Sequence, residues 1–301
     1  SVIVMPKTQS EEKKNELKTY GAELILVPAV PYSNSKNYVR YSETLSNKIK
    51  KKNKNKSVLW ANQFDNLANF QAHYETTGPE IWQQTKGRVN AFVSAIGTGG
   101  SISGVSSFLK EKNSDITICL ADPPGAALFN YYQHGELKSE GSSITEGIGQ
   151  GRITNNLINT QIDRAFLIPD QDTIDTMFRM VKEEGLFLGS SSGINVAGSI
   201  RLAKEMGPGH CIVTLLCDSG SRYLSRLYNP DFLKSKKLKN NHSKEEINYI
   251  VNAYRDSKIS DNHMSQWIKA VFNNGMDNNE VIAYTDSIIN SGKSLTFKNQ
   301  K

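Results

Sequence analysis

The chain has 301 residues, with 36 lysines and arginines against 30 aspartates and glutamates and 38% hydrophobic residues, a composition that can form a packed core. The six surplus positive charges equal one local run of lysines between residues 48 and 56, so the rest of the chain is neutral. Proteins that bind nucleic-acid phosphates spread basic side chains over a surface, and a membrane span needs about 18 consecutive apolar residues. Neither feature occurs, and we expect no nucleic-acid partner and no membrane partner.

The three cysteines, Cys119, Cys211 and Cys217, form no C-x-x-C pair, and two of them lie in apolar runs. This usage predicts three buried thiols in a reducing compartment, which favours a cytoplasmic protein. We expect neither a disulfide framework nor a metal site.

Strand and helix patterns alternate through residues 2–233. Strands are predicted at 2–5, 23–27, 57–61, 91–96, 116–121, 165–168 and 211–216. Helices are predicted at 11–20, 37–50, 68–86, 101–111, 171–185 and 192–206, with Ser10 as the cap of the first. Alternation of this kind predicts an α/β fold with a mostly parallel sheet flanked by helices.

The composition changes after residue 233. Residues 234–242 form a polar linker, and the pattern from 243 to 301 contains no convincing strand. Ser243 and Glu246 predict a capping box at the start of a helix, and two further helical patterns follow, one ending at Gly275. The sequence therefore predicts a small all-helical module at 243–301.

The strongest local motif comprises Gly97, Thr98, Gly99, Gly100 and Ser101, between a predicted strand and a predicted helix. Glycines leave successive backbone N–H groups uncovered, and a helix N-terminus adds partial positive charge, so the motif predicts a site for a phosphate group. The alternative is a tight strand-to-helix connection that binds nothing. A dinucleotide loop is disfavoured because Ile102 stands where the third glycine belongs, and no Gly-Lys-Ser/Thr of a Walker A loop follows.

Two further clusters lie in the same α/β region, Gly189–Gly193 at a helix start and Glu146–Gly151 in a loop. Taken singly, the first indicates a helix cap. The three glycines of the second suit a loop that lies against a flat ligand, with a flexible surface turn as the alternative. The three clusters together are far more specific, and they continue into longer motifs. These are Pro6-x3-Ser10, Tyr20–Glu23, Gln63–Asn69, Ala72–Tyr74, Thr76–Trp82, Gly97–Ser101, Glu146–Arg152, Gly189–Gly193 and Ser219–Ser225.

In these motifs, residues 1–233 resemble the cysteine synthase family, enzymes of fold type II that use pyridoxal 5'-phosphate. The resemblance implies replacement of the β-substituent of O-acetylserine by sulfide to give L-cysteine, in a homodimer. By matching position, Gly97, Thr98, Gly99, Gly100 and Ser101 would hold the cofactor phosphate, and Ser191 would hydrogen-bond the pyridine nitrogen. Gln63 would face the substrate carboxylate and Gly147 would line the loop over the ring, whereas His73 matches no catalytic position and is expected to be a packed helix residue.

The sequence departs from the family pattern in one respect. The family's Schiff-base lysine and its Ser-x-Gly-Asn-Thr loop precede everything that matches, and neither motif occurs in the 301 residues. The resemblance therefore assigns no catalytic residue, and we expect the chain by itself to be inactive. It also divides the matched region into residues 1–63, the remaining part of a small domain, and 64–233, a large cofactor-binding domain.

The tail resembles a different family. Residues 243–297, with Met264-Ser265-x-Trp267 and Ser291-Gly292, are similar to the N-terminal helical part of thymidine and pyrimidine-nucleoside phosphorylases. An unrelated helical appendage is the alternative. For the first region, the alternatives are a sister enzyme, cystathionine β-synthase or serine/threonine dehydratase, and a non-catalytic module that keeps the phosphate site without the chemistry.

Overall fold

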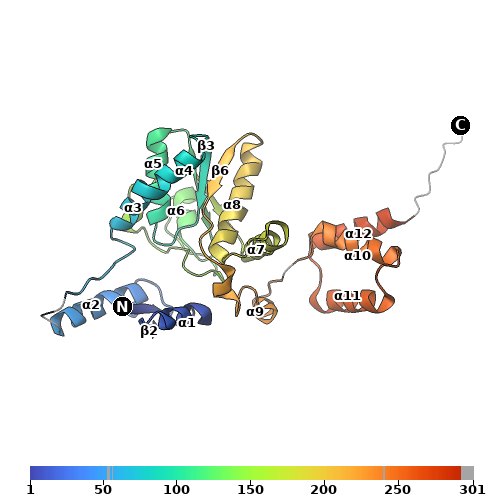
Figure 1. The fold of residues 1–301 in the computed structure, drawn as a ribbon, viewed down its shortest axis with the longest axis horizontal. Helices are drawn as coiled ribbons and strands as arrows, with labels where there is room; N and C mark the ends of the chain where they lie inside the picture. Colours follow the sequence, from blue (N-terminus) through green and yellow to red (C-terminus); the bar gives the residue numbers. More distant parts are fainter. Residues whose placement is uncertain (53–54, 56, 240, 293–301) are drawn as a thin grey trace. The chain divides into compact units, whose positions relative to one another are not determined.

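The computed structural model describes residues 1–52, 55, 57–239 and 241–292, and the chain divides into two compact units, Ser1–Lys239 and Asn240–Lys301 (Figure 1). Each unit is described by itself. The first contains two parallel sheets with helices around them, which confirms the predicted α/β class.

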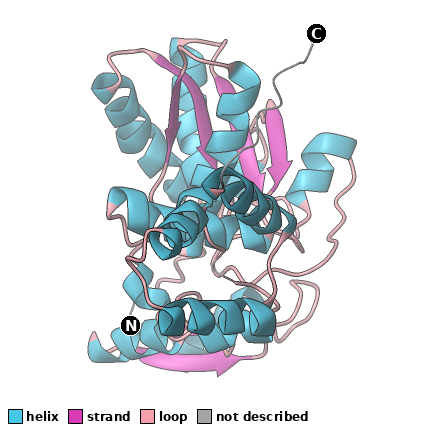
Figure 2. Ribbon diagram, turned by 90° about the vertical axis from the view of Figure 1, so that its right-hand side faces the viewer, coloured by secondary structure: helices cyan, strands magenta, loops and turns pink. Residues whose placement is uncertain are grey.

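The first sheet has two parallel strands, β1 (Val2–Pro6) and β2 (Glu23–Val27), joined by helix α1 (Glu11–Thr19) and followed by α2 (Tyr38–Lys52). It lies apart from the second sheet in Figure 2. Ser10 precedes α1 as expected but does not cap it, because its hydroxyl donates to the carbonyl of Arg222 at 2.7 Å. Part of the lysine run continues α2, while Lys54 and Lys56 lie outside the described residues.

The strand predicted at 57–61 is wrong, since these residues have no regular structure. An isolated extended segment needs a neighbouring strand to satisfy its backbone, and none lies beside it among the described residues. The Leu59 side chain is 90% exposed, so no packing compensates for the missing ladder.

The second sheet has four parallel strands in the order β5-β4-β3-β6. The strands are β3 (Val89–Ser94), β4 (Thr117–Asp122), β5 (Arg164–Leu167) and β6 (Cys211–Thr214). The α-helices of this region are α3 (Ala68–Ala72), α4 (Gly78–Gln84), α5 (Gly100–Lys112), α6 (Leu128–His134), α7 (Asp170–Glu184), α8 (Ser190–Met206) and α9 (Pro230–Ser235). The helix predicted at 68–86 consists of α3 and α4 with a π-helical turn, His73–Thr77, between them.

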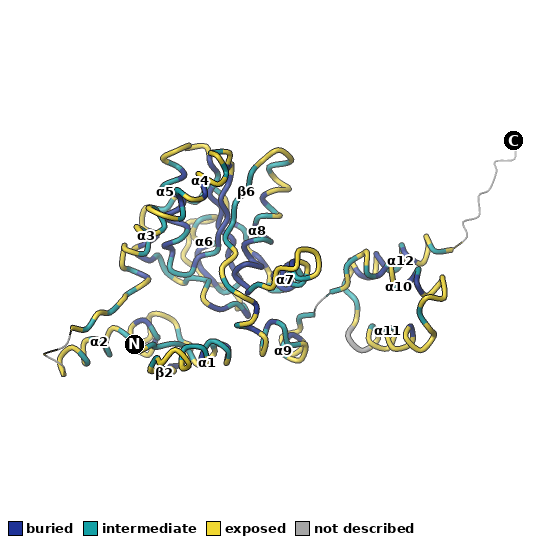
Figure 3. Tube along the Cα trace, viewed as in Figure 1, coloured by how far each residue is buried: buried dark blue, intermediate teal, exposed yellow. Residues whose placement is uncertain are grey.

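Helices cover both faces of this sheet, as Figures 1 and 3 show, and alternate residues of each strand enter different cores. Phe92 packs with Ile102 and Leu109 of α5 on one face. Its neighbour Val93 packs with Ile194 of α8 on the other. Burial on both faces explains the nearly continuous apolar runs from which the strands were predicted. At their carboxyl ends, β3 and β6 lead directly into the loops that hold the candidate site.

The second unit contains α10 (Lys244–Arg255), α11 (Asp261–Asn274) and α12 (Asn278–Ser291), with no strand among its described residues. The capping box of Ser243 and Glu246 is confirmed, and α11 ends before Gly275 as predicted. Ile247 and Val251 of α10 are buried, as is Ala283 of α12, so these apolar residues form a small interior.

The expectation of three buried thiols is confirmed only for Cys119. Cys119 is buried in β4 and Cys211 is partly buried in β6, but Cys217 is exposed. Cys217 follows the end of β6, where the chain leaves the sheet. All three are free thiols.

Candidate functional site

The glycine motif forms the connection from β3 to α5. Gly99 is the N-cap residue of α5 with a φ of +92°, a left-handed conformation that residues with a Cβ rarely adopt. The helix is 13 residues long, and its first N–H groups have no partner one turn earlier. The loop therefore offers backbone donors and the positive end of a helix dipole to an anion.

Two side chains, those of Asn69 and Thr154, hold this loop in place. The Asn69 amide donates to Thr98 Oγ1 at 2.8 Å and to the Gln63 carbonyl at 2.9 Å, and Thr154 Oγ1 donates to the Thr98 carbonyl at 2.8 Å. A Cβ at Gly100 would lie 2.1 Å from Asn69 Oδ1, so the loop approaches Asn69 as closely as only glycine allows. Asn69 belongs to a recognised motif, but sequence reasoning gave it no role.

The loop around Gly147 packs against the glycine motif. A Cβ at Gly97 would lie 2.5 Å from the Gly147 carbonyl oxygen, and the Gly149 N–H donates to the Ile96 carbonyl at 2.9 Å. Glu146 anchors the other side of this loop by ion pairs with Lys13 of α1, at 3.2 Å, and with Arg226. The structure thus brings two of the predicted segments together.

Gln63 is joined to the glycine motif through Asn69, and its side chain is exposed. Its carbonyl accepts from Asn69 and from Asn156, at 3.2 Å. Two residues later, Asp65 forms a bidentate pair with Arg152, with distances of 2.9 and 2.7 Å. Hydrogen bonds from that guanidinium lower the pKa of Asp65. The main chain at Gln63 is therefore fixed while its amide side chain faces solvent.

His73 packs in its helical segment as expected, but it also reaches the glycine motif. Its Nε2 lies 3.1 Å from Ser101 Oγ, and its Nδ1 lies 3.0 Å from Thr77 Oγ1. Burial lowers the pKa of His73, so the neutral ring is favoured. A neutral imidazole between two hydroxyls orients Ser101 without adding charge.

Ser191 lies in the first turn of α8, whose N-cap residue is Gly189, and is 6% exposed. Its hydroxyl lies beside the Cys217 thiol and lowers the pKa of that group, against the larger effect of burial. The backbone N–H of Cys217 donates to Ser192 Oγ at 2.9 Å. Although Cys217 is exposed as a residue, the protein around its sulfur desolvates the thiol and raises its pKa, so the thiol stays protonated at neutral pH. The Ser191 hydroxyl therefore lies at the start of α8 as a donor for an acceptor placed there.

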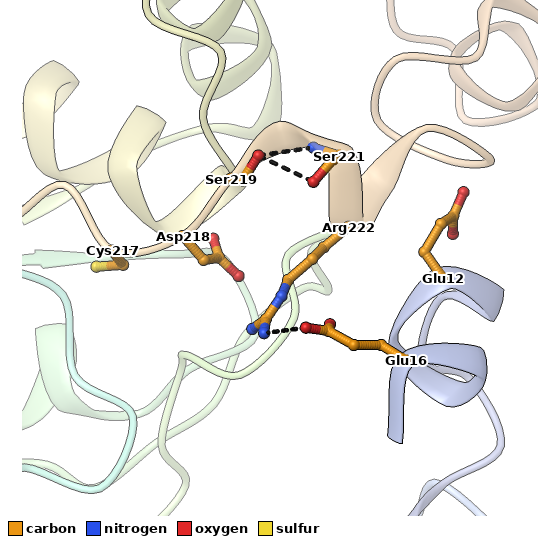
Figure 4. Close-up of a pocket in the computed structure, with 7 residues that line it drawn as sticks. All are labelled: Glu12, Glu16, Cys217, Asp218, Ser219, Ser221 and Arg222. Atoms are coloured by element: carbon orange, nitrogen blue, oxygen red, sulfur yellow. Dashed lines mark hydrogen bonds and ion pairs between the residues drawn. The ribbon is translucent and has the colours of Figure 1, made fainter. Parts of the chain in front are cut away.

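A cavity of about 550 Å³ adjoins this end of α8 (Figure 4). It is lined by Glu12, Glu16, Cys217, Asp218, Ser219, Ser221 and Arg222. Arg222 pairs with Glu16 at 3.0 Å, and Glu12 accepts two hydrogen bonds of 2.7 Å from Ser225. These contacts join α1 to the turn after β6 and give Glu12, Glu16 and Arg222 protein partners, whereas Asp218 Oδ1 is buried without a hydrogen-bond partner among the described residues.

In the part of the chain that the structure describes, no group of three or more histidine, cysteine, aspartate or glutamate side chains could hold a metal ion. No helix among those residues is long and apolar enough to cross a membrane.

A glycine-rich helix N-terminus in an α/β unit, with a hydroxyl at the start of a neighbouring helix, is typical of enzymes that hold a phosphorylated cofactor. The family of pyridoxal-phosphate dependent enzymes matches residues 1–218, and the chain belongs to this family. The predicted membership and the predicted cofactor class are thereby confirmed.

More particular relatives are cysteine synthases. The chain is 45% identical over 260 residues to cysteine synthase 1 of Emericella nidulans, covering 83% of this chain and 67% of that protein. It is 46% identical over 246 residues to cysteine synthase 1 of Neurospora crassa, covering 79% of this chain and 63% of that protein. The chain thus spans about two thirds of the length of these relatives.

A solved structure agrees with this placement. The O-acetylserine-dependent cystathionine β-synthase from Helicobacter pylori matches with a TM-score of 0.64 and 27% sequence identity, covering 75% of this chain and 69% of that chain. The comparisons place the chain among cysteine synthase-like proteins, while the roles of individual site residues stay predictions.

Proposed function

We propose that the chain carries the cofactor-binding part of an enzyme that makes L-cysteine from O-acetylserine and sulfide. The observation that carries the proposal is the glycine loop at the N-terminus of α5, where Gly99 has a positive φ and the helix dipole suits an anion. Bound pyridoxal phosphate supplies an electron sink for chemistry at the α-carbon of an amino acid. The names of the cysteine synthase relatives support the substrate class.

The residues present fit the phosphate end of this cofactor. Side chains at Gly97 or Gly100 would clash with neighbouring atoms, so only glycine fits there, and the Gly100 N–H makes one long hydrogen bond, 3.4 Å, to Thr98 Oγ1. Asn69 fixes Thr98, and His73 fixes Ser101, which gives both hydroxyls a defined direction beside the loop. A phosphate dianion would accept hydrogen bonds from the backbone and from these hydroxyls, and the dipole of α5 would stabilise its charge.

Ser191 fits the ring end. Its hydroxyl lies in the first turn of α8 and would donate a hydrogen bond to the pyridine nitrogen. A hydroxyl donates a hydrogen bond but does not keep that nitrogen protonated, whereas a carboxylate would. The electron-withdrawing power of the ring is therefore moderate, which suits elimination and replacement at the β-carbon.

Gln63 and Gly147 belong to the substrate side of the proposal. The exposed amide of Gln63 is a neutral donor for a carboxylate, and its fixed main chain limits the positions that the amide can reach. The positive φ of Gly147, +81°, lets its loop turn beside Gly97. Both residues would then orient the amino-acid substrate over the ring.

A second candidate is a cystathionine β-synthase-like reaction, favoured by the name of the Helicobacter pylori protein. The two reactions differ in the sulfur nucleophile that replaces the β-substituent, which is sulfide in one case and homocysteine in the other. Measuring whether sulfide or homocysteine competes for the site once the ligand is bound distinguishes the two reactions.

Further parts of the proposal concern the whole protein. We propose a homodimer in the cytoplasm and a helical part at 243–301 of the phosphorylase type. We also propose the division of the first unit into residues 1–63 and 64–233.

Binding of a non-reactive cofactor analogue tests the proposed function. Pyridoxine 5'-phosphate keeps the phosphate and the ring but has no aldehyde, so it cannot attach to lysines. We expect the full chain to bind it in isothermal titration calorimetry, and Gly97→Ala to weaken binding about tenfold, or ~1.4 kcal/mol, because the added Cβ displaces the loop from Gly147.

Gly151→Ala is the matched control. A Cβ at Gly151 would meet its nearest atom at 3.9 Å, an ordinary contact, and we expect the same affinity as the unaltered chain. Equal affinity of both variants, or no binding to the unaltered chain, contradicts the proposed site.

A further inference from the structure

Asn195 is a buried amide that connects the ends of two strands. It lies on α8 one turn after Ser191, and its exposed fraction is zero. Its Oδ1 accepts from the Ala95 N–H at 2.6 Å, and its Nδ2 donates to the Leu215 carbonyl at 2.8 Å. Both ends of the amide are therefore bound to main chain, which is a fully satisfied buried polar group.

The position of these two contacts follows from the sheet. β3 and β6 are neighbouring parallel strands, and Val93 and Thr214 are the last paired residues of their ladder. Ala95 and Leu215 come directly beyond the strands, where the two chains no longer bond to each other. The Asn195 amide bridges these two segments as a peptide group would, and so sets the distance between them.

Both segments, the one after β3 and the one after β6, continue into the proposed cofactor site. Two residues after Ala95 the glycine motif begins, and two residues after Leu215 comes Cys217. Cys217 is tied to the first turn of α8 by its N–H bond to Ser192, and its sulfur lies 3.8 Å from Asn195 Nδ2. Asn195 thus contacts the routes to both proposed ends of the ligand.

We propose that Asn195 is a positioning residue that sets the separation between the glycine loop and the Ser191 hydroxyl. This inference rests on the proposed function, which assigns the phosphate to one and the pyridine nitrogen to the other. A ligand that must reach both needs a fixed separation, whereas an ion that touches only the loop does not. The residue therefore acts through main-chain position and does not itself touch the ligand.

Asn195→Leu removes both hydrogen bonds and keeps the number and branching of the side-chain heavy atoms. Calorimetry on the full chain then compares two probes, pyridoxine 5'-phosphate and inorganic phosphate. We expect about a tenfold loss of affinity for pyridoxine 5'-phosphate, equivalent to ~1.4 kcal/mol, and an inorganic phosphate affinity within about twofold of the unaltered chain. Equal losses for the two probes, or no loss for either, overturn the proposal.

Asn195→Asp provides a gentler change and a pH signature. Its neutral acid form accepts from Ala95 and donates to Leu215 as the amide does, but its carboxylate cannot donate. Relative to the unaltered chain at the same pH, we expect near-normal affinity for pyridoxine 5'-phosphate in acid and a progressive loss as the carboxyl ionises. A constant ratio across pH contradicts the positioning role.

Asn37→Leu is the matched control. Asn37 is also a buried amide, 6% exposed, that donates to the Val30 carbonyl at 2.8 Å and accepts from the Val39 N–H at 3.0 Å. It precedes α2, remote in sequence from both loops, and we expect its replacement to leave the ratio of the two affinities unchanged. A matching change of that ratio in Asn37→Leu assigns the effect to general destabilisation and overturns the proposal.

Hydrogen–deuterium exchange without any ligand separates this inference from the proposed function. In Asn195→Leu, peptides covering 95–101 and 215–218 should both exchange faster, and in Asn37→Leu neither should. If the unaltered chain binds no pyridoxine 5'-phosphate but this exchange pattern is found, only the proposed function fails. If the analogue binds but exchange changes within α8 alone, only the role of Asn195 fails.

Discussion

Asp122 ends β4 with a fully buried side chain, and its replacement by asparagine tests how the carboxyl is held. Its Oδ2 accepts from the Phe129 N–H at 2.9 Å, at the start of α6. Its Oδ1 has no hydrogen-bond partner among the described residues. Burial raises the pKa of Asp122 from 3.8 to about 7, although the N–H groups of Phe129 and Leu128 oppose the rise.

The direction of the pH effect follows from this rise. Between pH 3.8 and about 7 the folded protein binds a proton at Asp122 that the unfolded chain has lost, so the free energy of unfolding falls as pH increases. Each pKa unit equals about 1.4 kcal/mol, so the whole window corresponds to about 4 kcal/mol. Asparagine resembles the neutral acid and does not titrate. Asp122→Asn should therefore match the unaltered chain in acid and exceed its stability by about 4 kcal/mol at pH 8.

Urea unfolding of the full chain, followed by circular dichroism between about pH 4 and pH 8, measures this difference. Asp115→Asn, at an exposed position in the loop before β4, is the control and should not change the pH dependence. An unfolding free energy for Asp122→Asn at pH 8 equal to or lower than that of the unaltered chain refutes the reasoning.

Three further predictions concern single side chains. Ser191→Ala should weaken pyridoxine 5'-phosphate binding by about 1 kcal/mol in calorimetry. Ser190→Ala removes a buried hydroxyl that lacks a partner among the described residues, and it should not weaken binding. The reverse order of the two effects would show that the wrong serine is assigned. Asp65→Asn should lower the free energy of unfolding at neutral pH by about 2 kcal/mol. Because the pKa of Asp65 is lowered in the folded protein, this advantage of the unaltered chain should be lost as pH falls below 3.8. An advantage that persists in acid contradicts the ion pair. Iodoacetamide should modify exposed Cys217 well before Cys119, whose pKa burial raises to about 12, as peptide mass spectrometry would show; early labelling of Cys119 contradicts the buried strand.

Much of the fold was predictable because local patterns agree with it. Apolar runs predicted the strands of the buried sheet, and capping residues predicted the helix that begins after Ser243. The segment 57–61 has a strand-like composition as well, but a strand requires a partner, which only the rest of the molecule can provide. Similarly, Cys217 follows an apolar run, yet it lies beyond the last residue of β6.

The site was predictable where its chemistry is local. The glycine motif combines a turn, uncovered N–H groups and a helix start within five consecutive residues. By contrast, Asn69 and Asn195 contact the main and side chains of this region across 29 and 100 residues of sequence. No short-range pattern marks a side chain that acts at such separations, and only the three-dimensional structure shows these contacts.

The most direct measurement is a crystal structure of the full chain with pyridoxine 5'-phosphate bound. We predict that the phosphate oxygens lie within hydrogen-bond distance of backbone N–H groups of residues 97–101 and that the pyridine nitrogen faces Ser191 Oγ. A phosphate bound at any other place, with the loop at the start of α5 free of ligand, would contradict the account.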